Sequence, residues 1–175
     1  GLQELCASIR EFGVIQPLIV RKTDSGYELI AGERRLRASG MAGLDEVPCV
    51  LRDASDKEMA EIALIENLQR EDLHYFEEAL GYEQLLLQFH LTQEVLAERV
   101  GKTQSTIANK LRLLKLPPDM RDFIYQEKLT ERHSRALLKV EEPERQWELL
   151  KFVAENKLNV REAESLIEAR LQDAP

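Results

Sequence analysis

The spacing of apolar and polar residues changes character part-way along the chain. Up to about residue 55, the spacing switches every few residues between the helical period and the alternation of a strand. The elements expected there are a helix over 2–13, strands over 17–22 and 27–31 around the turn TDSG, a helix over 32–40 and a strand over 47–53. This order predicts a small mixed α/β unit.

From residue 55 onward the spacing is almost purely helical. Ser55 followed by Glu58 has the pattern of a capping box at a helix start. The expected helices cover 55–69, 76–89, 92–101, 103–116, 118–128, 131–140, 143–157 and 159–172. We therefore predict an α+β protein in which a mixed α/β domain over 1–75 precedes an all-α domain over 76–175.

The composition is that of an ordinary globular protein, with 43% hydrophobic and 32% charged residues. The apolar runs are too short to span a bilayer, and no signal peptide is visible. The chain lacks an initiator methionine and begins inside an apparent helix, so a longer natural protein is expected. Cys6 and Cys49 match no metal-ligand spacing, and both are expected to be buried, reduced thiols in the cytosol.

Charge is distributed unevenly along the chain. The whole chain carries −8, which by itself argues against a nucleic-acid partner. Residues 91–140, however, contain ten lysines and arginines against six aspartates and glutamates, so this segment carries +4 and the remainder −12. A basic segment on an acidic chain indicates where a nucleic acid would bind.

That basic segment contains the spacing of a helix-turn-helix over about 92–115. Ala97 is a small residue in the first helix, Gly101 allows a tight turn four residues later, and Ile107 falls on the buried face of the second helix. The seam between the two helices is expected to contain Leu96, Val100, Ile107 and Leu111. In such motifs the second helix lies in the DNA major groove.

The second helix carries polar side chains suited to reading DNA. Gln and Asn can pair with adenine, Lys with guanine, and Ser or Thr with phosphates or base edges. The candidate DNA-binding residues are Thr103 as the helix cap and Gln104, Ser105, Thr106, Asn109, Lys110, Arg112 and Lys115. A helical hairpin with a merely solvated polar face is the alternative. The helix expected after Thr130 adds Arg132 as a further candidate. The residues of that helix by themselves favour a solvated surface helix over a DNA contact.

A second cluster, AGERRLRA, places Arg34 and Arg35 at the start of a helix, directly after a strand and Gly32. Positive charge is unfavourable at that end of a helix unless an anion binds the free N–H groups. A polyphosphate gripped by the two guanidinium groups would explain the arrangement, with Glu33 near the phosphates or paired with an arginine.

Two other stretches supply polar groups that could complete such a site. Gln16 precedes Pro17 at a strand entrance, and Glu66 and Asn67 offer the oxygen ligands that Mg²⁺ takes beside phosphates. The alternative for Glu66 is an i,i+4 ion pair with Arg70. The sequence contains no glycine-rich loop with a Lys-Ser or Lys-Thr pair, so it is not that of a P-loop enzyme.

The segments GVIQPLIVR, AGERRLRA, IENLQRED and VGKTQSTIANKLRLLKLP, in this order, resemble the ParB family of bacterial chromosome-segregation proteins. The resemblance covers nearly the whole chain. Within the family, four positions match the nucleoid occlusion branch, Noc: Gln104, Lys110, Lys115 and Arg132. Partitioning members usually carry arginine where Gln104 stands here.

The resemblance implies a CTP-dependent DNA clamp. A ParB- and sulfiredoxin-like N-terminal domain would bind CTP with Mg²⁺, and the helix-turn-helix would read a short palindromic site in double-stranded DNA. Two engaged copies would close a ring, and slow CTP hydrolysis would reopen it. By motif, the nucleotide ligands are Gln16, Gly32, Glu33, Arg34, Arg35, Glu66, Asn67 and Arg70. Of these, Gln16 and Glu33 are the candidates for hydrolysis, and Glu66 and Asn67 are the candidates for the metal.

The resemblance also implies an assembly and a location, on the nucleoid in the bacterial cytoplasm. The family's C-terminal dimerisation domain does not occur before Pro175, so homodimerisation of this chain is expected to depend on nucleotide and DNA. The amphipathic membrane helix of nucleoid occlusion proteins is not found either. Membrane contact is therefore expected only through a segment outside this sequence.

Three alternatives remain at this stage. The first is a partitioning ParB that binds a centromere-like site. The second is a plain helix-turn-helix transcription regulator, in which Arg34 and Arg35 only pair with nearby acids. The third is a phosphotransferase, because sulfiredoxin has a related nucleotide-binding core; that chemistry needs a catalytic cysteine, and Cys49 lies in a strand expected to be buried.

Overall fold

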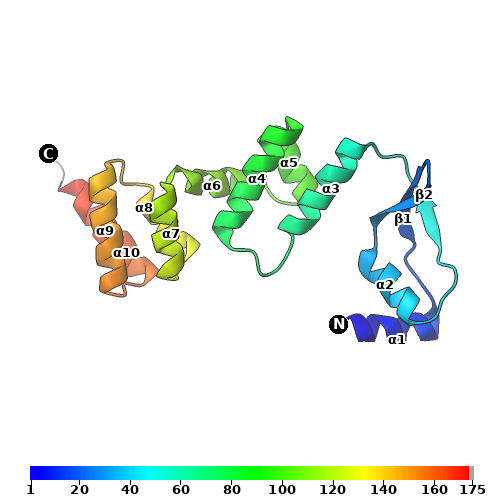
Figure 1. The fold of residues 1–175 in the computed structure, drawn as a ribbon. Coiled ribbons are helices and arrows are strands. Elements are labelled where there is room, and N and C mark those ends of the chain that lie inside the picture. Colours follow the sequence, from blue (N-terminus) through cyan, green and yellow to red (C-terminus); the bar gives the residue numbers. More distant parts are fainter. Residues whose placement is uncertain (174–175) are drawn as a thin grey trace. The chain divides into compact units, whose positions relative to one another are not determined.

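The structure is a computed structural model that describes residues 1–173. Its contacts divide the chain into two compact units, the first over Gly1–Ala63 and the second from Leu64 onward (Figure 1). The first unit contains the only strands among the described residues, and the second is helical. The predicted fold class, a mixed α/β part followed by an all-α part, is therefore confirmed.

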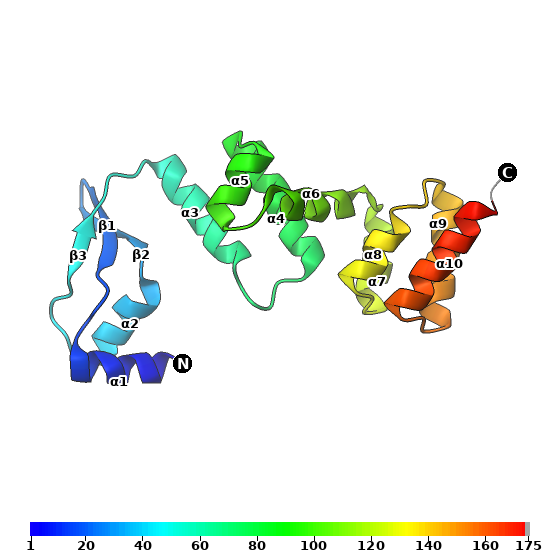
Figure 2. The same cartoon turned by 180° about the vertical axis from the view of Figure 1, so that it is seen from behind.

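A three-stranded sheet in the order β2-β1-β3 forms the first unit together with two helices (Figures 1 and 2). β1 pairs antiparallel with β2 and parallel with β3. Cys6, Ile9 and Ala38 form the small core between the helices. The elements are α1 (Leu2–Phe12), β1 (Leu18–Thr23), β2 (Gly26–Ala31), α2 (Glu33–Met41) and β3 (Cys49–Leu51).

The third strand differs from its sequence-based prediction. It has three residues, and all three are exposed, because β3 lies at the edge of the sheet. Cys6 is buried as expected, but the expectation that Cys49 is buried is wrong. Burial of Cys49 is therefore no argument against the phosphotransferase alternative.

Arg21 connects the sheet of the first unit to the start of the next helix, α3 (Asp56–Leu68). Its guanidinium donates to Glu28 at 2.6 Å on the neighbouring strand, to Asp56 at 2.9 Å and to the Ala54 carbonyl at 3.0 Å. The Arg21 side chain is only 13% exposed. One charged group thus fixes where the chain leaves the sheet. Ser55 caps α3 as predicted, because its Oγ accepts the Glu58 N–H at 3.1 Å.

The division between the units lies inside α3, earlier than the boundary expected near residue 75. The reason is the apolar side of the last turns of α3. Leu68 is buried there with Tyr82 and Leu85 of the following helix, and Leu64 and Ile65 pack on the same cluster. The end of α3 therefore belongs to the helical unit.

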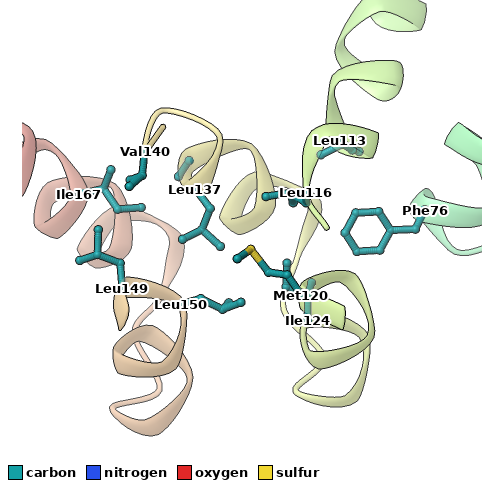
Figure 3. Packing of buried hydrophobic residues seen from close by; sticks show 11 residues of the cluster. Phe76, Leu113, Leu116, Met120, Ile124, Leu137, Val140, Leu149, Leu150 and Ile167 are labelled. Atoms are coloured by element: carbon teal, nitrogen blue, oxygen red, sulfur yellow. The ribbon is translucent and has the colours of Figure 1, made fainter. Parts of the chain in front are cut away.

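The helical unit contains α4 (Tyr75–Phe89), α5 (Gln93–Val100), α6 (Gln104–Arg112), the 3-10 turn η1 (Leu113–Lys115), α7 (Pro118–Gln126), α8 (Glu131–Leu137), α9 (Pro143–Glu155) and α10 (Val160–Gln172). Another apolar cluster packs α7, α8, α9 and α10 together (Figure 3). Phe76, Leu113 and Leu116 extend it to α4 and η1. The helix expected over 103–116 ends at Arg112, because the chain tightens into η1 to bury Leu113.

Gly81 of α4 lies against Leu68 at the end of α3. A Cβ built on Gly81 would lie 2.0 Å from Cδ2 of Leu68, far inside van der Waals contact. Gly81 is buried on α4, so the absence of a side chain there lets Leu68 of α3 approach the backbone of α4.

We predict that Gly81→Ala destabilises the packing of α3 on α4 by about 1–3 kcal/mol, since overpacking outweighs the gain in helix propensity. Amide hydrogen exchange in α3 and α4 measures the change. Gly40→Ala is the matched control: Gly40 lies in α2 with nothing within 4 Å of an added Cβ, so no loss is expected. Leu68→Ala should reduce the penalty of Gly81→Ala; a stabilised Gly81→Ala variant would contradict the steric argument.

Candidate nucleic-acid interface and phosphate-binding turn

The helix-turn-helix forms as predicted. Gly101 ends α5 in the left-handed conformation, with φ 70° and ψ 33°, which a glycine adopts without strain. Leu96, Val100 and Ile107 are buried between the two helices, and Leu111 packs on them. This burial fixes the rotation of α6, and so decides which of its side chains face outward.

Caps made by side chains fix the start of both helices. Thr92 Oγ1 accepts the Val95 N–H at 3.2 Å, and Thr103 Oγ1 accepts the Thr106 N–H at 3.2 Å. The Thr103 hydroxyl also lies 2.8 Å from that of Thr106 and 3.2 Å from that of Ser105. The three hydroxyls are therefore already connected at the start of α6, the end that a major-groove helix presents to base edges.

The candidate DNA-binding residues differ in exposure. Five of them are exposed: Thr103, Gln104, Ser105, Arg112 and Lys115. Thr106 and Asn109 are half-buried. Arg132, on α8, is 64% exposed at its side chain and lies 3.4 Å from Glu164.

Lys110 is not on the exposed face where the sequence placed it. Its side chain is 15% exposed, and its ammonium lies 3.0 Å from Glu78 of α4 and 3.1 Å from Glu131 of α8. Tyr82 donates to the other oxygen of Glu78 at 2.7 Å, and burial raises the pKa of the Tyr82 phenol far above its usual value. Neither carboxylate was recognised from the sequence, because Lys110 is distant from both along the chain.

The start of α8 is held by a buried network that sequence reasoning also missed. Thr130 caps the helix, and His133 completes the capping box by accepting the Thr130 N–H at 3.1 Å. The other ring nitrogen of His133 is 3.0 Å from the Leu158 carbonyl. Tyr75 donates to the Leu129 carbonyl at 2.8 Å. His133 therefore has a structural part, because both of its ring nitrogens contact the backbone.

In the first unit, the turn from β2 into α2 has the geometry of an anion site. Gly32 is left-handed, with φ 105°, and a Cβ there would lie 2.6 Å from Leu18. Only glycine therefore fits the position without a shift of Leu18. Among the described residues, no hydrogen bond or ion pair engages the exposed guanidinium of Arg34. The Glu33 carboxylate lies 3.6 Å from Arg37, with both side chains 65% exposed.

Arg35 has a different part in the turn. Its Nη1 donates to the carbonyls of Gln16 at 2.8 Å and Pro17 at 2.7 Å, and its side chain is half-buried. The structure therefore brings Gln16 and the arginine turn together, as expected, but through the backbone of Gln16. Of the two arginines, Arg34 is the one that is free to bind a ligand.

The remaining nucleotide candidates, Glu66, Asn67 and Arg70, lie in the second unit and are exposed. The alternative ion pair between Glu66 and Arg70 is not the one observed: Arg70 pairs with Asp72 at 3.4 Å. The reason is that α3 ends at Leu68, so Arg70 is no longer on the helical path that brings i and i+4 together. Within residues 1–173, no three His, Cys, Asp or Glu side chains gather into a metal-binding group.

Two protein families match this chain, one over each part. Residues 1–68 match the ParB N-terminal domain, and residues 71–172 match the ParB helix-turn-helix domain. The chain belongs to the ParB family. The resemblance seen in the four sequence segments is thereby confirmed.

Relatives of this ParB-family chain carry two different names. The chromosome-partitioning protein Spo0J of Thermus thermophilus is 56% identical over 175 residues, all of this chain and 64% of that protein. The nucleoid occlusion protein of Bacillus cereus (strain AH187) is 48% identical over 174 residues, 99% of this chain and 60% of that protein. The chain thus spans less than two thirds of the length of these relatives.

Solved structures agree with the fold. The C-terminally truncated chromosome-partitioning protein ParB from Caulobacter crescentus, complexed to the centromeric parS site, matches 96% of this chain and 87% of that one at 38% identity, with a TM-score of 0.78. A ParB DNA-binding domain complexed to parS matches 66% of this chain and 90% of that one at 40% identity, with a TM-score of 0.55.

Among the helices of residues 1–173, none has both the length and the apolar character that a membrane span requires.

We predict that Arg35→Ala destabilises the first unit by about 1–3 kcal/mol, because the carbonyls of Gln16 and Pro17 lose their donor. Arg34→Ala should change stability by less than about 0.5 kcal/mol, because its side chain is exposed and unengaged. Amide hydrogen exchange in β1 is the measurement. Equal effects of the two substitutions would contradict the division between a structural and a free arginine.

Proposed function

We propose that this chain is the nucleotide-binding and DNA-reading part of a ParB-family clamp of the nucleoid occlusion type. It reads a short palindrome in double-stranded DNA through α6 and binds CTP at the turn before α2. Two copies engage in response to CTP and DNA and enclose the duplex. Such a protein acts on the nucleoid in the bacterial cytoplasm and regulates cell division.

The observation that carries DNA recognition is the exposed face of α6. Gln104 and Ser105 stand at its first turn and Arg112 at its last, while the opposite face is closed by Ile107, whose side chain is 0% exposed. The likeness to a ParB solved on parS extends over 96% of the chain with a TM-score of 0.78, which supports the same use of α6 here. Gln can pair with adenine, and Arg112 and Lys115 can neutralise phosphates.

The turn before α2 supports the nucleotide part of the proposal. Left-handed Gly32 opens the backbone at the start of the helix, where N–H groups are unpaired, and Arg34 stands beside it without a partner among the described residues. Such a turn suits the phosphates of a nucleotide. The choice of cytidine rests on the family resemblance alone.

Mg²⁺ and hydrolysis are finer parts of the same proposal. The exposed oxygens of Glu66 and Asn67 are of the hard-donor type that Mg²⁺ accepts together with phosphate oxygens, so these residues would hold the ion jointly with the nucleotide. The ion would neutralise phosphate charge. Glu33 and the Gln16 amide are the groups we assign to slow CTP hydrolysis, and Arg70 to the triphosphate or the engaged interface.

Calorimetric titration with CTP and Mg²⁺ tests the nucleotide site. We predict that Arg34→Ala weakens CTP binding by at least about tenfold, the effect of losing a charge-assisted hydrogen bond to phosphate. Arg52→Ala, another exposed arginine of the first unit, is the control that should bind normally. Palindrome binding by Arg34→Ala should be unchanged. If the wild-type chain does not respond to CTP, the plain transcription regulator is favoured instead.

A chromosome-partitioning role is the second candidate, and the 56% identity to the Spo0J protein supports it. Nucleoid occlusion is favoured by the side chain at the first position of α6, Gln104, which is exposed at the end of the helix that such motifs present to base edges. An arginine there would read guanine rather than adenine. The two roles differ in the DNA site rather than in the chemistry of the nucleotide.

Fluorescence anisotropy on the parS palindrome and on the palindrome of nucleoid occlusion proteins separates the two. We predict that the wild-type chain prefers the latter, and that Gln104→Arg lowers this preference by about tenfold, as expected for one base contact worth about 1–3 kcal/mol. Gln172→Arg near the end of α10 is a control for added charge. A preference for parS in the wild type would establish the partitioning role.

A further inference from the structure

Lys110 joins three helices of the second unit. Its ammonium contacts Glu78 Oε2 of α4 at 3.0 Å and both carboxylate oxygens of Glu131 of α8 at 3.1 Å. The side chain of Lys110 is 15% exposed, that of Glu78 22% and that of Glu131 28%. They form a partly buried cluster, which we call the Lys110 cluster, with a net charge of −1.

Helical geometry explains why Lys110 is in this cluster. Successive residues of an α-helix are rotated by about 100°, so Lys110 lies only about 60° around α6 from the fully buried Ile107. Ser105 and Arg112 lie roughly 140–160° from Ile107, on the outward face. Lys110 is therefore directed to the side of α6 that faces the protein.

The donors of Lys110 are already committed. An ammonium has three N–H groups, and the two carboxylates present three oxygens to it within 3.1 Å. Glu78 is held in place on its other oxygen by Tyr82, which is 3% exposed. For Lys110 to reach DNA, it would have to leave two partly buried carboxylates unpaired side by side, which is unfavourable.

Glu131 connects the cluster to a second DNA-binding candidate. It is the first residue of α8, and Arg132 follows it directly. The contact between Lys110 and Glu131 therefore links the first turn of α8, which carries Arg132, directly to α6.

We propose that Lys110 is a positioning residue: with Glu131 and Glu78 it fixes Arg132 against the recognition helix, without contacting DNA itself. This inference rests on the proposed reading of a palindrome by α6. It adds Glu78 and Glu131 to the residues that determine which site is read, and it changes the part of Lys110 from a base or phosphate contact to a support.

The test combines site preference with salt dependence. Affinities for the two palindromes are measured by anisotropy at several salt concentrations for Lys110→Met, Lys110→Arg, Glu131→Gln and the double variant Lys110→Met/Glu131→Gln. Arg112→Ala is the reference for a lost phosphate contact, and Glu155→Gln, an exposed acid at the end of α9, is the control for a lost negative charge. Trp147 fluorescence and circular dichroism verify that each variant is folded.

Lys110→Met and Glu131→Gln are each expected to lower the preference for the cognate palindrome by about tenfold, and the double variant by no more than Lys110→Met alone, as for residues acting as one unit. Lys110→Arg should retain the preference, because it keeps both carboxylates paired. The slope of log affinity against log salt should be unchanged in Lys110→Met and reduced by about 0.9 in Arg112→Ala.

Each of the following results would overturn the inference while leaving the proposed function intact. One is a salt slope reduced by about 0.9 in Lys110→Met, which marks a direct phosphate contact. The other is additivity of Lys110→Met and Glu131→Gln, or a Glu131→Gln variant no different from Glu155→Gln. A wild-type chain that binds neither palindrome would instead overturn the proposed function, and this role with it.

Discussion

The burial of Ile107 is the constraint on which the DNA-reading surface depends. With its side chain fully enclosed by α4 and α5, α6 has one permitted rotation. Every other assignment on this helix follows from that rotation: Ser105 and Arg112 face outward, while Lys110 faces the protein and meets Glu78 and Glu131. Left-handed Gly101 makes the arrangement possible, because it sets the short turn that brings Leu96 and Val100 onto the same seam.

Most of the fold could be predicted from the sequence because it is encoded locally. Apolar periodicity located the helices, and Thr103 and Thr130 cap theirs as their residue types indicated. What could not be predicted is the choice of partner by a long polar side chain. Lys110 was placed on an exposed surface because nothing near it in sequence shows that acids 32 positions before it and 21 after it come within reach.

The same limit applies to the arginine-rich turn. The sequence presents Arg34 and Arg35 as equivalent, and only the structure separates them. Arg35 donates to the carbonyls of Gln16 and Pro17 and so stabilises the turn. Arg34 is exposed and remains available to bind a ligand. Cys49 was misjudged for a related reason: an apolar run indicates a strand, but whether that strand is central or at an edge depends on the pairing order.

The exposed thiol of Cys49 has a practical consequence. Cys6 is buried, so a maleimide reagent would attach a dye to the first unit at a single position. The chain's only tryptophan, Trp147, lies in the second unit. Trp147 and a dye on Cys49 would therefore lie in different units. Fluorescence energy transfer from Trp147 to that dye can follow domain rearrangement in real time, and no new cysteine has to be introduced.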